Sequence, residues 1–174
     1  EGGFEYASEL ITHIRQNFAF CIGGAGFPEG HLESPDLETD TAYLKMKVDS
    51  GAEFIITQLF FDNADFMAFM DRADRADISV PVIAGVLPIL STGQIRRFTA
   101  LCGAKIPPDL DARLERFADD DDAVREIGVE QAAKQVEELW RNGVDGVHFY
   151  SLNKSYSVSR SLDTVAPSRE RSTV

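Results

Sequence analysis

Two hydrophobic patterns alternate along the chain. Short, nearly continuous apolar runs are typical of strands that are buried on both faces of a parallel sheet. They cover residues 18–25, 54–61, 80–87 and 147–152. Apolar residues at three- and four-residue spacing, with charged residues between them, predict amphipathic helices. These cover residues 4–17, 35–50, 91–102, 110–117 and 119–142, and a further helix begins at Asp62 or Asn63.

The alternation of strands and helices predicts an α/β fold with a parallel sheet under helical cover. Only four strands are predicted, whereas a closed (β/α)8 barrel takes about 250 residues. Two architectures therefore fit: the C-terminal half of a (β/α)8 TIM barrel, with about its last four βα units, or a small open α/β sheet. We expect the domain to span residues 1–160 and the polar residues 161–174 to form a tail or linker.

Composition narrows the class of protein. With 44% hydrophobic and 26% charged residues, the chain resembles ordinary soluble globular domains. No apolar run approaches the ~18 residues that cross a bilayer, so we expect a cytoplasmic protein without a membrane partner. Its 17 basic and 29 acidic residues give a formal charge of -12, which would repel nucleic acid. Cys21 and Cys102 lack metal-site spacing, and buried, reduced thiols are expected, with no metal site.

The stretch 26–62 carries the most informative polar residues. Its loop contains His31, and the helix after it is expected to begin with Ser34 as the N-cap. Asp40, Tyr43 and Lys47 form a polar stripe beside the apolar stripe of that helix. Asp40 and Lys47 are two turns apart, too far for a direct i to i+4 bridge, so each needs another partner.

Other candidates follow the later strands, because ligands gather at the carboxyl ends of parallel strands. Gln58 is an amide within an apolar strand, and a ligand there could satisfy its donors and acceptors. Gln94 has a structural explanation instead, as part of a capping box with Ser91. His148 and Tyr150 alternate onto one face of the last strand. Residue patterns alone therefore indicate an α/β domain with a ligand site at its strand ends.

Longer motifs resemble one enzyme family. In chain order they are GFPEGH, DTAYLKMKVDSGA, ITQLFFD, VIAGVLPI, DDDAVREIGVE and HFYSLN. Their order and separations resemble methylenetetrahydrofolate reductase from about Phe4 to Leu162. The resemblance implies a flavoprotein TIM barrel, in which NAD(P)H reduces FAD and the flavin reduces 5,10-methylenetetrahydrofolate to 5-methyltetrahydrofolate. It also implies a homo-oligomer of the complete chain and a role in one-carbon metabolism and methionine biosynthesis.

The resemblance assigns roles to residues at the cofactor. His31, Asp40 and Lys47 match residues that hold FAD, and Lys47 would neutralise its diphosphate. Phe27 stands where the family often has tyrosine, so an aromatic wall is kept and a hydroxyl is lost.

A second set of residues matches the family's substrate contacts. Gln58 matches the glutamine that meets folate and nicotinamide in turn, and Gln94 and Phe98 match residues of the same pocket. Tyr150 matches a folate-binding tyrosine. Lys154 replaces the family's arginine. A lysine can still contact a carboxylate of the folate, but it cannot form the bidentate pair that an arginine forms.

The family's general acid, a glutamate on the first barrel strand, and its aspartate near the flavin ring match nothing in this sequence. No catalytic residue is therefore assigned within these 174 residues, and the chain alone is expected to be inactive. The alternative is a non-catalytic half-barrel that binds a ligand or a partner.

Overall fold

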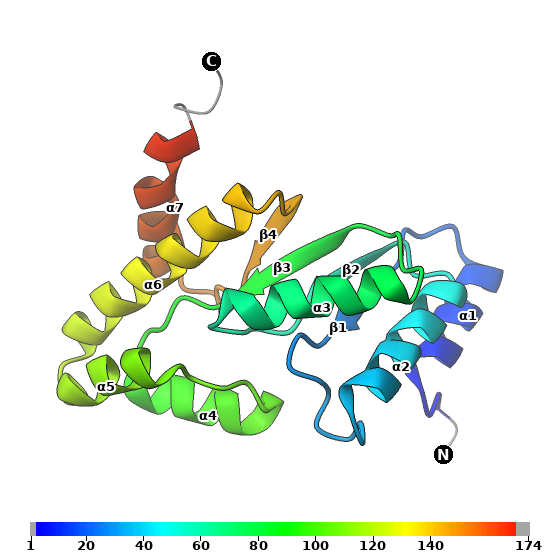
Figure 1. Cartoon of the computed structure of the whole chain (residues 1–174), viewed down its shortest axis with the longest axis horizontal. Helices are drawn as coiled ribbons and strands as arrows, with labels where there is room; N and C mark the ends of the chain where they lie inside the picture. Colours follow the sequence, from blue (N-terminus) through cyan, green and yellow to red (C-terminus); the bar gives the residue numbers. More distant parts are fainter. Residues whose placement is uncertain (1–2, 170–174) are drawn as a thin grey trace.

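A single parallel sheet organises the molecule (Figure 1). The computed structural model describes residues 3–169. The strands are β1 (Gly23–Gly26), β2 (Phe54–Thr57), β3 (Val82–Val86) and β4 (Gly146–Phe149), in the order β1-β2-β3-β4. The helices are α1 (Ala7–Asn17), α2 (Leu37–Asp49), α3 (Asn63–Arg75), α4 (Thr92–Cys102), α5 (Pro108–Arg116), α6 (Asp121–Arg141) and α7 (Ser155–Arg169). The predicted α/β fold with four parallel strands is confirmed.

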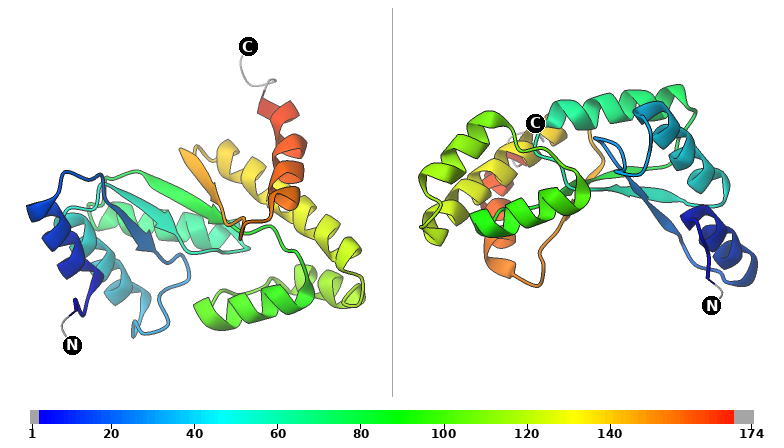
Figure 2. Two further views of the ribbon diagram at one scale, coloured as in Figure 1. Left: turned by 180° about the vertical axis from the view of Figure 1, so that it is seen from behind. Right: turned by 90° about the horizontal axis from the view of Figure 1, so that it is seen from below.

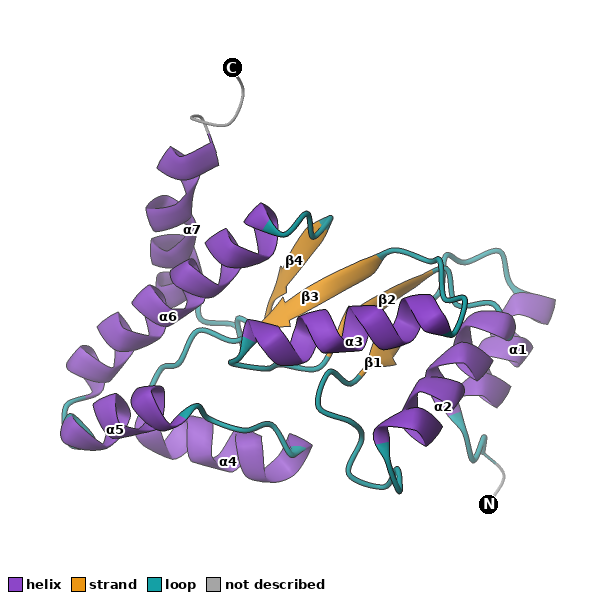
Figure 3. Ribbon diagram, in the orientation of Figure 1, coloured by secondary structure: helices purple, strands orange, loops and turns teal. Residues whose placement is uncertain are grey.

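The helices α2, α3 and α6 lie on one face of the sheet, and the view from behind in Figure 2 looks onto the opposite face of the strands. The main core lies between these helices and the strands, where Phe66 and Phe69 of α3 meet Ile55 of β2 and Val136 of α6. All four side chains are at most 2% exposed. Figure 3 distinguishes the strands of the sheet from the surrounding helices and the connecting loops by colour. In the described part of the chain, no helix combines the length and the apolar character that crossing a membrane requires.

The first predicted strand is shorter than its apolar run. Only Gly23–Gly26 pairs with β2, whereas Phe18 and Phe20 are 52% and 63% exposed. The two phenylalanine rings stack on each other, with centroids 5.6 Å apart, and do not enter the core. Cys21 next to them is exposed and Cys102 is only partly buried, so the expectation of two buried thiols was wrong.

The N-cap of helix α2 lies two residues later than the predicted one. Asp36 is the N-cap, and its carboxylate accepts a hydrogen bond from the backbone N–H of Thr39. Ser34, the expected cap, instead uses its hydroxyl to bind the Asp40 carboxylate. The difference matters because it assigns Ser34 to the site described below.

The predicted tail is wrong in part, because residues up to Arg169 form helix α7. Ser161 and Val165 are 0% and 2% exposed, and Val165 belongs to the main core with Ala133 and Val136 of α6. Small side chains let α7 pack closely on α6, which explains how a polar segment can be helical and buried. Residues 170–174 of the expected tail lie outside the described residues.

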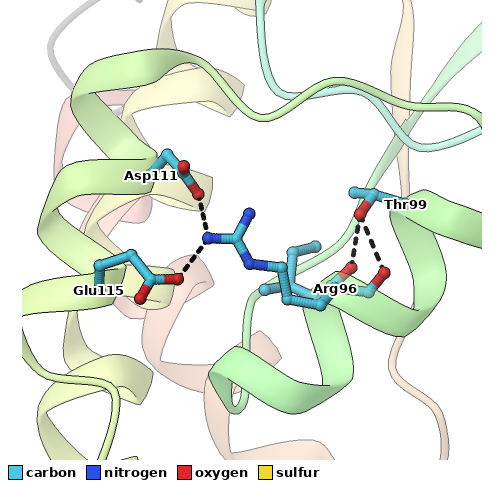
Figure 4. Close-up of polar contacts among 5 residues, drawn as sticks. Arg96, Thr99, Asp111 and Glu115 are labelled. Carbon is cyan, nitrogen blue, oxygen red and sulfur yellow. Dashed lines mark hydrogen bonds and ion pairs between the residues drawn. The ribbon is translucent and has the colours of Figure 1, made fainter.

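Helix α4 is set apart from the sheet and is joined to α5 by a charged contact (Figure 4). Arg96 of α4 extends between Asp111 and Glu115 of α5, and its Nη2 lies 2.6 Å from the Asp111 carboxylate and 2.5 Å from the Glu115 carboxylate. The two helices also share apolar contacts, since Ile95 of α4 belongs to one core cluster with Leu110 and Leu114 of α5.

Candidate functional site

A groove of about 600 Å³ runs along α2 beside the end of β1. We call it the α2 groove, and its lining residues are Tyr6, Ala7, Ser8, Ala25, Phe27, His31, Glu33, Ser34, Asp40, Tyr43, Met46 and Lys47. All four residues predicted to hold a cofactor, Phe27, His31, Asp40 and Lys47, are among them. Parallel pairing explains the location, since β1 ends at Gly26 and the chain then crosses to α2.

Asp40 organises the loop that faces this groove. Its side chain is 7% exposed, and its Oδ1 accepts hydrogen bonds from the backbone N–H of His31 at 3.1 Å and from the Ser34 hydroxyl at 2.8 Å. A buried carboxylate is tolerated when such donors surround it. Asp40 therefore holds the 27–34 loop in one shape as well as lining the groove.

Lys47 brings a positive charge to the same groove. Its Nζ donates to the carbonyl oxygen of Ala25 at 2.8 Å and lies 5.2 Å from the centre of the Phe27 ring. Burial lowers the pKa of the Lys47 ammonium, and the nearby Asp40 carboxylate partly offsets this effect. The two residues have separate partners, as their spacing predicted.

His31 presents one ring nitrogen for a ligand. Its Nδ1 accepts a hydrogen bond from the backbone N–H of Glu33 at 3.2 Å, so the neutral ring carries its proton on Nε2. The ring meets Phe27 edge-on, with centroids 4.7 Å apart. The side chain is 41% exposed, which leaves the Nε2–H donor accessible.

A second, more apolar space of about 280 Å³ lies at the ends of β2, β3 and β4. We call it the strand-end cavity, and it is lined by Gln58, Leu59, Leu87, Phe98, Leu101, Cys102, Tyr150 and Leu152. The structure thus brings together Gln58, Phe98 and Tyr150, three of the five residues predicted to bind substrate. Helix α4 supplies Phe98 as one wall.

Gln58 and Tyr150 are held by backbone contacts at this cavity. The Gln58 Oε1 accepts from the backbone N–H of Leu59 at 2.9 Å. The Tyr150 hydroxyl donates to the carbonyl oxygen of Thr57 at 2.8 Å, and burial raises the pKa of its phenol. Because this carbonyl belongs to the peptide bond that precedes Gln58, Tyr150 fixes the backbone from which the glutamine extends.

Glycine at position 85 makes this contact possible. A Cβ on Gly85 would lie 2.2 Å from the Thr57 carbonyl oxygen and 2.8 Å from the Tyr150 ring. The Gly85 N–H also donates to the Thr57 hydroxyl at 2.9 Å. Close approach of the strands at this point requires the absence of a side chain.

Backbone strain marks the turn that follows β4. Leu152 and Asn153 have φ angles of 48° and 59°, in the left-handed region that non-glycine residues seldom occupy. Leu152 nevertheless lines the strand-end cavity. Strain of this kind persists only where the surrounding structure holds it, and it gathers at functional sites.

Two predicted substrate residues do not line this cavity. The Gln94 Oε1 accepts from the backbone N–H of Leu90 at 2.9 Å, and the Gln94 N–H donates to the Ser91 hydroxyl. The predicted capping box is confirmed only in part, because Ser91 is the N-cap but the Gln94 side chain binds the Leu90 N–H and not the Ser91 N–H. Lys154 lies exposed in the turn before α7, where its N–H donates to the carbonyl oxygen of Ser151.

Sequence reasoning missed several lining residues for which a signal existed. Leu101 follows Phe98 by three residues on α4, and Met46 follows Tyr43 by three residues on α2, so both share a face with a chosen residue. Leu152 lies two positions after Tyr150. Tyr6, in contrast, reaches the α2 groove from the segment before α1, and no local pattern predicts that contact.

Together these features define an α/β protein with a lysine-bearing groove of mixed polar and apolar lining and a neighbouring apolar cavity at the carboxyl edge of a parallel sheet. The described residues contain no group of three or more His, Cys, Asp or Glu that could hold a metal ion. Such a site can bind an extended anionic ligand in the groove and a planar ligand beside it.

The comparisons with known proteins identify the family. A family model for methylenetetrahydrofolate reductase matches residues 1–166, and the chain belongs to that family. Methylenetetrahydrofolate reductase 1 of Schizosaccharomyces pombe is 38% identical over 165 residues, which cover 94% of this chain and 27% of that protein. The 5,10-methylenetetrahydrofolate reductase of Escherichia coli is 36% identical over 160 residues, which cover 90% of this chain and 54% of that protein. The chain thus spans about half the length of the bacterial relative and about a quarter of the yeast one.

A solved structure supports the fold. An uncharacterised protein from Clostridium thermocellum, which binds two copies of 5-methyl-5,6,7,8-tetrahydrofolic acid, matches with a TM-score of 0.55 at 20% identity. The match covers 88% of this chain and 56% of that chain. At this identity the likeness concerns the fold alone.

Proposed function

We propose that the protein containing this chain reduces 5,10-methylenetetrahydrofolate to 5-methyltetrahydrofolate, with FAD as cofactor and NAD(P)H as hydride donor. Family membership supports an oxidoreductase that acts on methylenetetrahydrofolate. The single observation that carries the finer assignment is the position of the α2 groove next to the strand-end cavity. Phe27 borders the first space, Gln58 borders the second, and both line a small cavity between them.

The residues of the α2 groove fit a flavin dinucleotide. Lys47 offers a cation for the diphosphate, His31 offers an Nε2–H donor, and Phe27 offers an aromatic wall. A volume of about 600 Å³ is within the usual range for cofactor sites. Bound there, a flavin supplies the two-electron chemistry that passes a hydride from the nicotinamide to the folate.

This chain's own residues would bind and orient the reactants. Gln58 would meet the folate and the nicotinamide in turn, since it lines both the strand-end cavity and the small cavity between the two spaces, and Phe98 would flank the ring system of either one. Tyr150 would fix the Gln58 backbone through Thr57. Gln94 and Lys154 stay predicted substrate contacts, and the general acid is proposed to lie on another segment of the complete protein.

The proposal includes the architecture. The open, four-stranded parallel sheet with helices on one face fits the C-terminal half of a (β/α)8 barrel, whose remaining strands would pair with β1 and β4. Ligands would then bind at the carboxyl ends of the strands, where both spaces lie.

The test uses the protein encoded by the complete gene. We expect a flavin absorption spectrum and NAD(P)H oxidation that depends on methylenetetrahydrofolate. Lys47→Met should lower flavin content, whereas Gln58→Ala should keep the flavin and lower kcat/KM for the folate by about tenfold or more. A purified protein with neither flavin nor folate-dependent NAD(P)H oxidation would refute the proposal and favour a non-catalytic binding domain.

A further inference from the structure

A buried carboxylate connects the two spaces without lining either of them. Glu29 lies in the 27–34 loop between β1 and α2, and its side chain is 7% exposed. Glu33, four residues later in the same loop, is 91% exposed. Burial raises the pKa of the Glu29 carboxyl, which means that the surrounding protein has removed it from water. A buried carboxylate in a surface loop needs an explanation by its partners.

Its partner is the backbone of the connection between α4 and α5. The backbone N–H of Lys105 donates to both carboxylate oxygens of Glu29, with N···O distances of 3.1 and 3.2 Å. The Lys105 ammonium is 3.7 Å from the nearer oxygen, but that side chain is 78% exposed and its charge is screened by water. The backbone hydrogen bond is therefore the main contact between the two segments.

Two further contacts hold the loop in this position. Arg72 of α3 donates through Nη2 to the carbonyl oxygen of Pro28 at 2.7 Å. Gly103, the C-cap of α4 with a φ of 75°, faces Leu32 so closely that a Cβ would lie 2.5 Å from the leucine side chain. The loop is thus fastened to α3 on one side and to the end of α4 on the other.

The loop and helix α4 carry residues of different spaces. The loop carries Phe27 and His31 of the α2 groove, and α4 carries Phe98 and Leu101 of the strand-end cavity. Helix α4 packs on the segments that follow β2 and β3 through the fully buried Ile95, which shares a core cluster with Leu59 and Leu87, and the loop contacts fix its C-terminal end. A fixed distance between the two spaces requires a link between loop and helix.

We propose that Glu29 is a positioning residue, which fastens the cofactor loop to the end of α4 and so sets the substrate cavity against the cofactor groove. This inference rests on the proposed function, because its readouts are flavin and folate binding. Glu29 lines neither the α2 groove nor the strand-end cavity, only the small cavity between them. Its loss should weaken binding of both ligands and leave the chemical step nearly unchanged.

The experiment compares variants of the complete, flavin-loaded protein. Glu29→Gln keeps the shape of the side chain but removes the charge that strengthens the bond to the Lys105 N–H. We expect the Kd for FAD and the KM for methylenetetrahydrofolate each to rise about fivefold to tenfold, with kcat within twofold of the parent value. Glu29→Asp keeps the charge but shortens the side chain, and it should give the same pattern if Glu29→Gln fails to fold.

Two matched controls isolate the contact. Glu38→Gln removes the same charge at an exposed position in the first turn of α2 that lines neither space, and it should leave both constants unchanged. Lys105→Met removes the ammonium but keeps the backbone N–H, and it should also leave them unchanged. If Lys105→Met reproduced the effect of Glu29→Gln, the backbone contact would be refuted as the link.

The outcome separates this inference from the proposed function. A parent protein without flavin or folate turnover would refute the proposed function. A parent protein with both activities, together with Glu29→Gln that has parent values of the FAD Kd and the folate KM, would refute the positioning role alone.

Discussion

The α2 groove and the strand-end cavity are built in different ways. Nine of the twelve lining residues of the groove come from one stretch of the chain, 25–47, and Asp40 and Lys47 make their hydrogen bonds within that stretch. The cavity takes residues from 58 to 152, and its shape depends on the pairing of β2, β3 and β4 and on the placement of α4. The first is a local structure of mixed polar and apolar lining, and the second is a long-range, almost entirely apolar one.

This difference predicts different responses to change. A substitution in the groove removes a hydrogen bond and affects a loop, whereas a substitution in the cavity disturbs the packing of the sheet itself. The three predictions below test this contrast, and the first has the largest expected effect.

Gly85→Ala should damage the cavity and the whole fold. The added Cβ would lie 2.2 Å from a backbone oxygen of β2, which cannot move without disrupting the sheet. We expect the free energy of unfolding to fall by about 3 kcal/mol, as measured by chemical denaturation. Gly93→Ala is the control, because a Cβ there meets nothing within 4 Å. It should be neutral or stabilising by about 0.5 kcal/mol, and equal losses for the two variants would contradict the steric argument.

Asp40→Ala should damage the groove and leave the sheet in place. It removes the acceptor of the His31 N–H and the Ser34 hydroxyl, and we expect a loss of about 2 kcal/mol together with faster proteolytic cleavage within residues 27–34. Asp40→Asn keeps an acceptor oxygen and should restore most of the protection of the loop. Cleavage in the strands before cleavage in this loop would show that the groove is not a local structure.

The smallest expected effect concerns Lys47. It is a change in how the free energy of unfolding depends on pH. Burial lowers the folded-state pKa of its ammonium below the ordinary value of 10.5, so the unfolded chain binds this proton more tightly. Stability of the unliganded protein should therefore rise as the pH rises toward 10.5, and Lys47→Met should remove that part of the rise. Urea denaturation at several alkaline pH values measures it. Lys134→Met, at an exposed position on α6, should keep the rise, and a parent protein without it would contradict the assigned burial effect.

The contrast also explains which parts of the molecule could be predicted from sequence. All four strands lie within or next to predicted apolar runs, because a strand that is buried on both faces consists almost entirely of apolar residues. The cofactor-side residues lie in one stretch, so a stripe on a helix and a nearby loop were enough to bring Asp40, Lys47 and His31 together. For the cavity, the rule that ligands gather at strand ends pointed to Gln58 and Tyr150, whereas Phe98 was chosen only through the family resemblance.

The failures have physical causes as well. Helix α7 was missed because its contact with α6 uses small side chains such as Ser157 and Ser161, which show no hydrophobic period. Phe18 and Phe20 were placed in a strand because apolar residues often are, but they pack on each other outside the sheet. The burial of Glu29 could not be predicted, since its partner is a backbone N–H that lies 76 positions away in the sequence.

In the turn at Leu152 and Asn153, the shape of the strand-end cavity is kept at a cost in folding stability. A leucine in left-handed backbone costs about 1 to 2 kcal/mol, a cost that glycine would avoid. At position 152, however, glycine would also delete a wall of the strand-end cavity. At position 153, asparagine already tolerates this conformation, and no cavity wall depends on it. An engineer could therefore stabilise the protein at 153 without cost to the cavity, while selection for a ligand site would keep the strained leucine at 152.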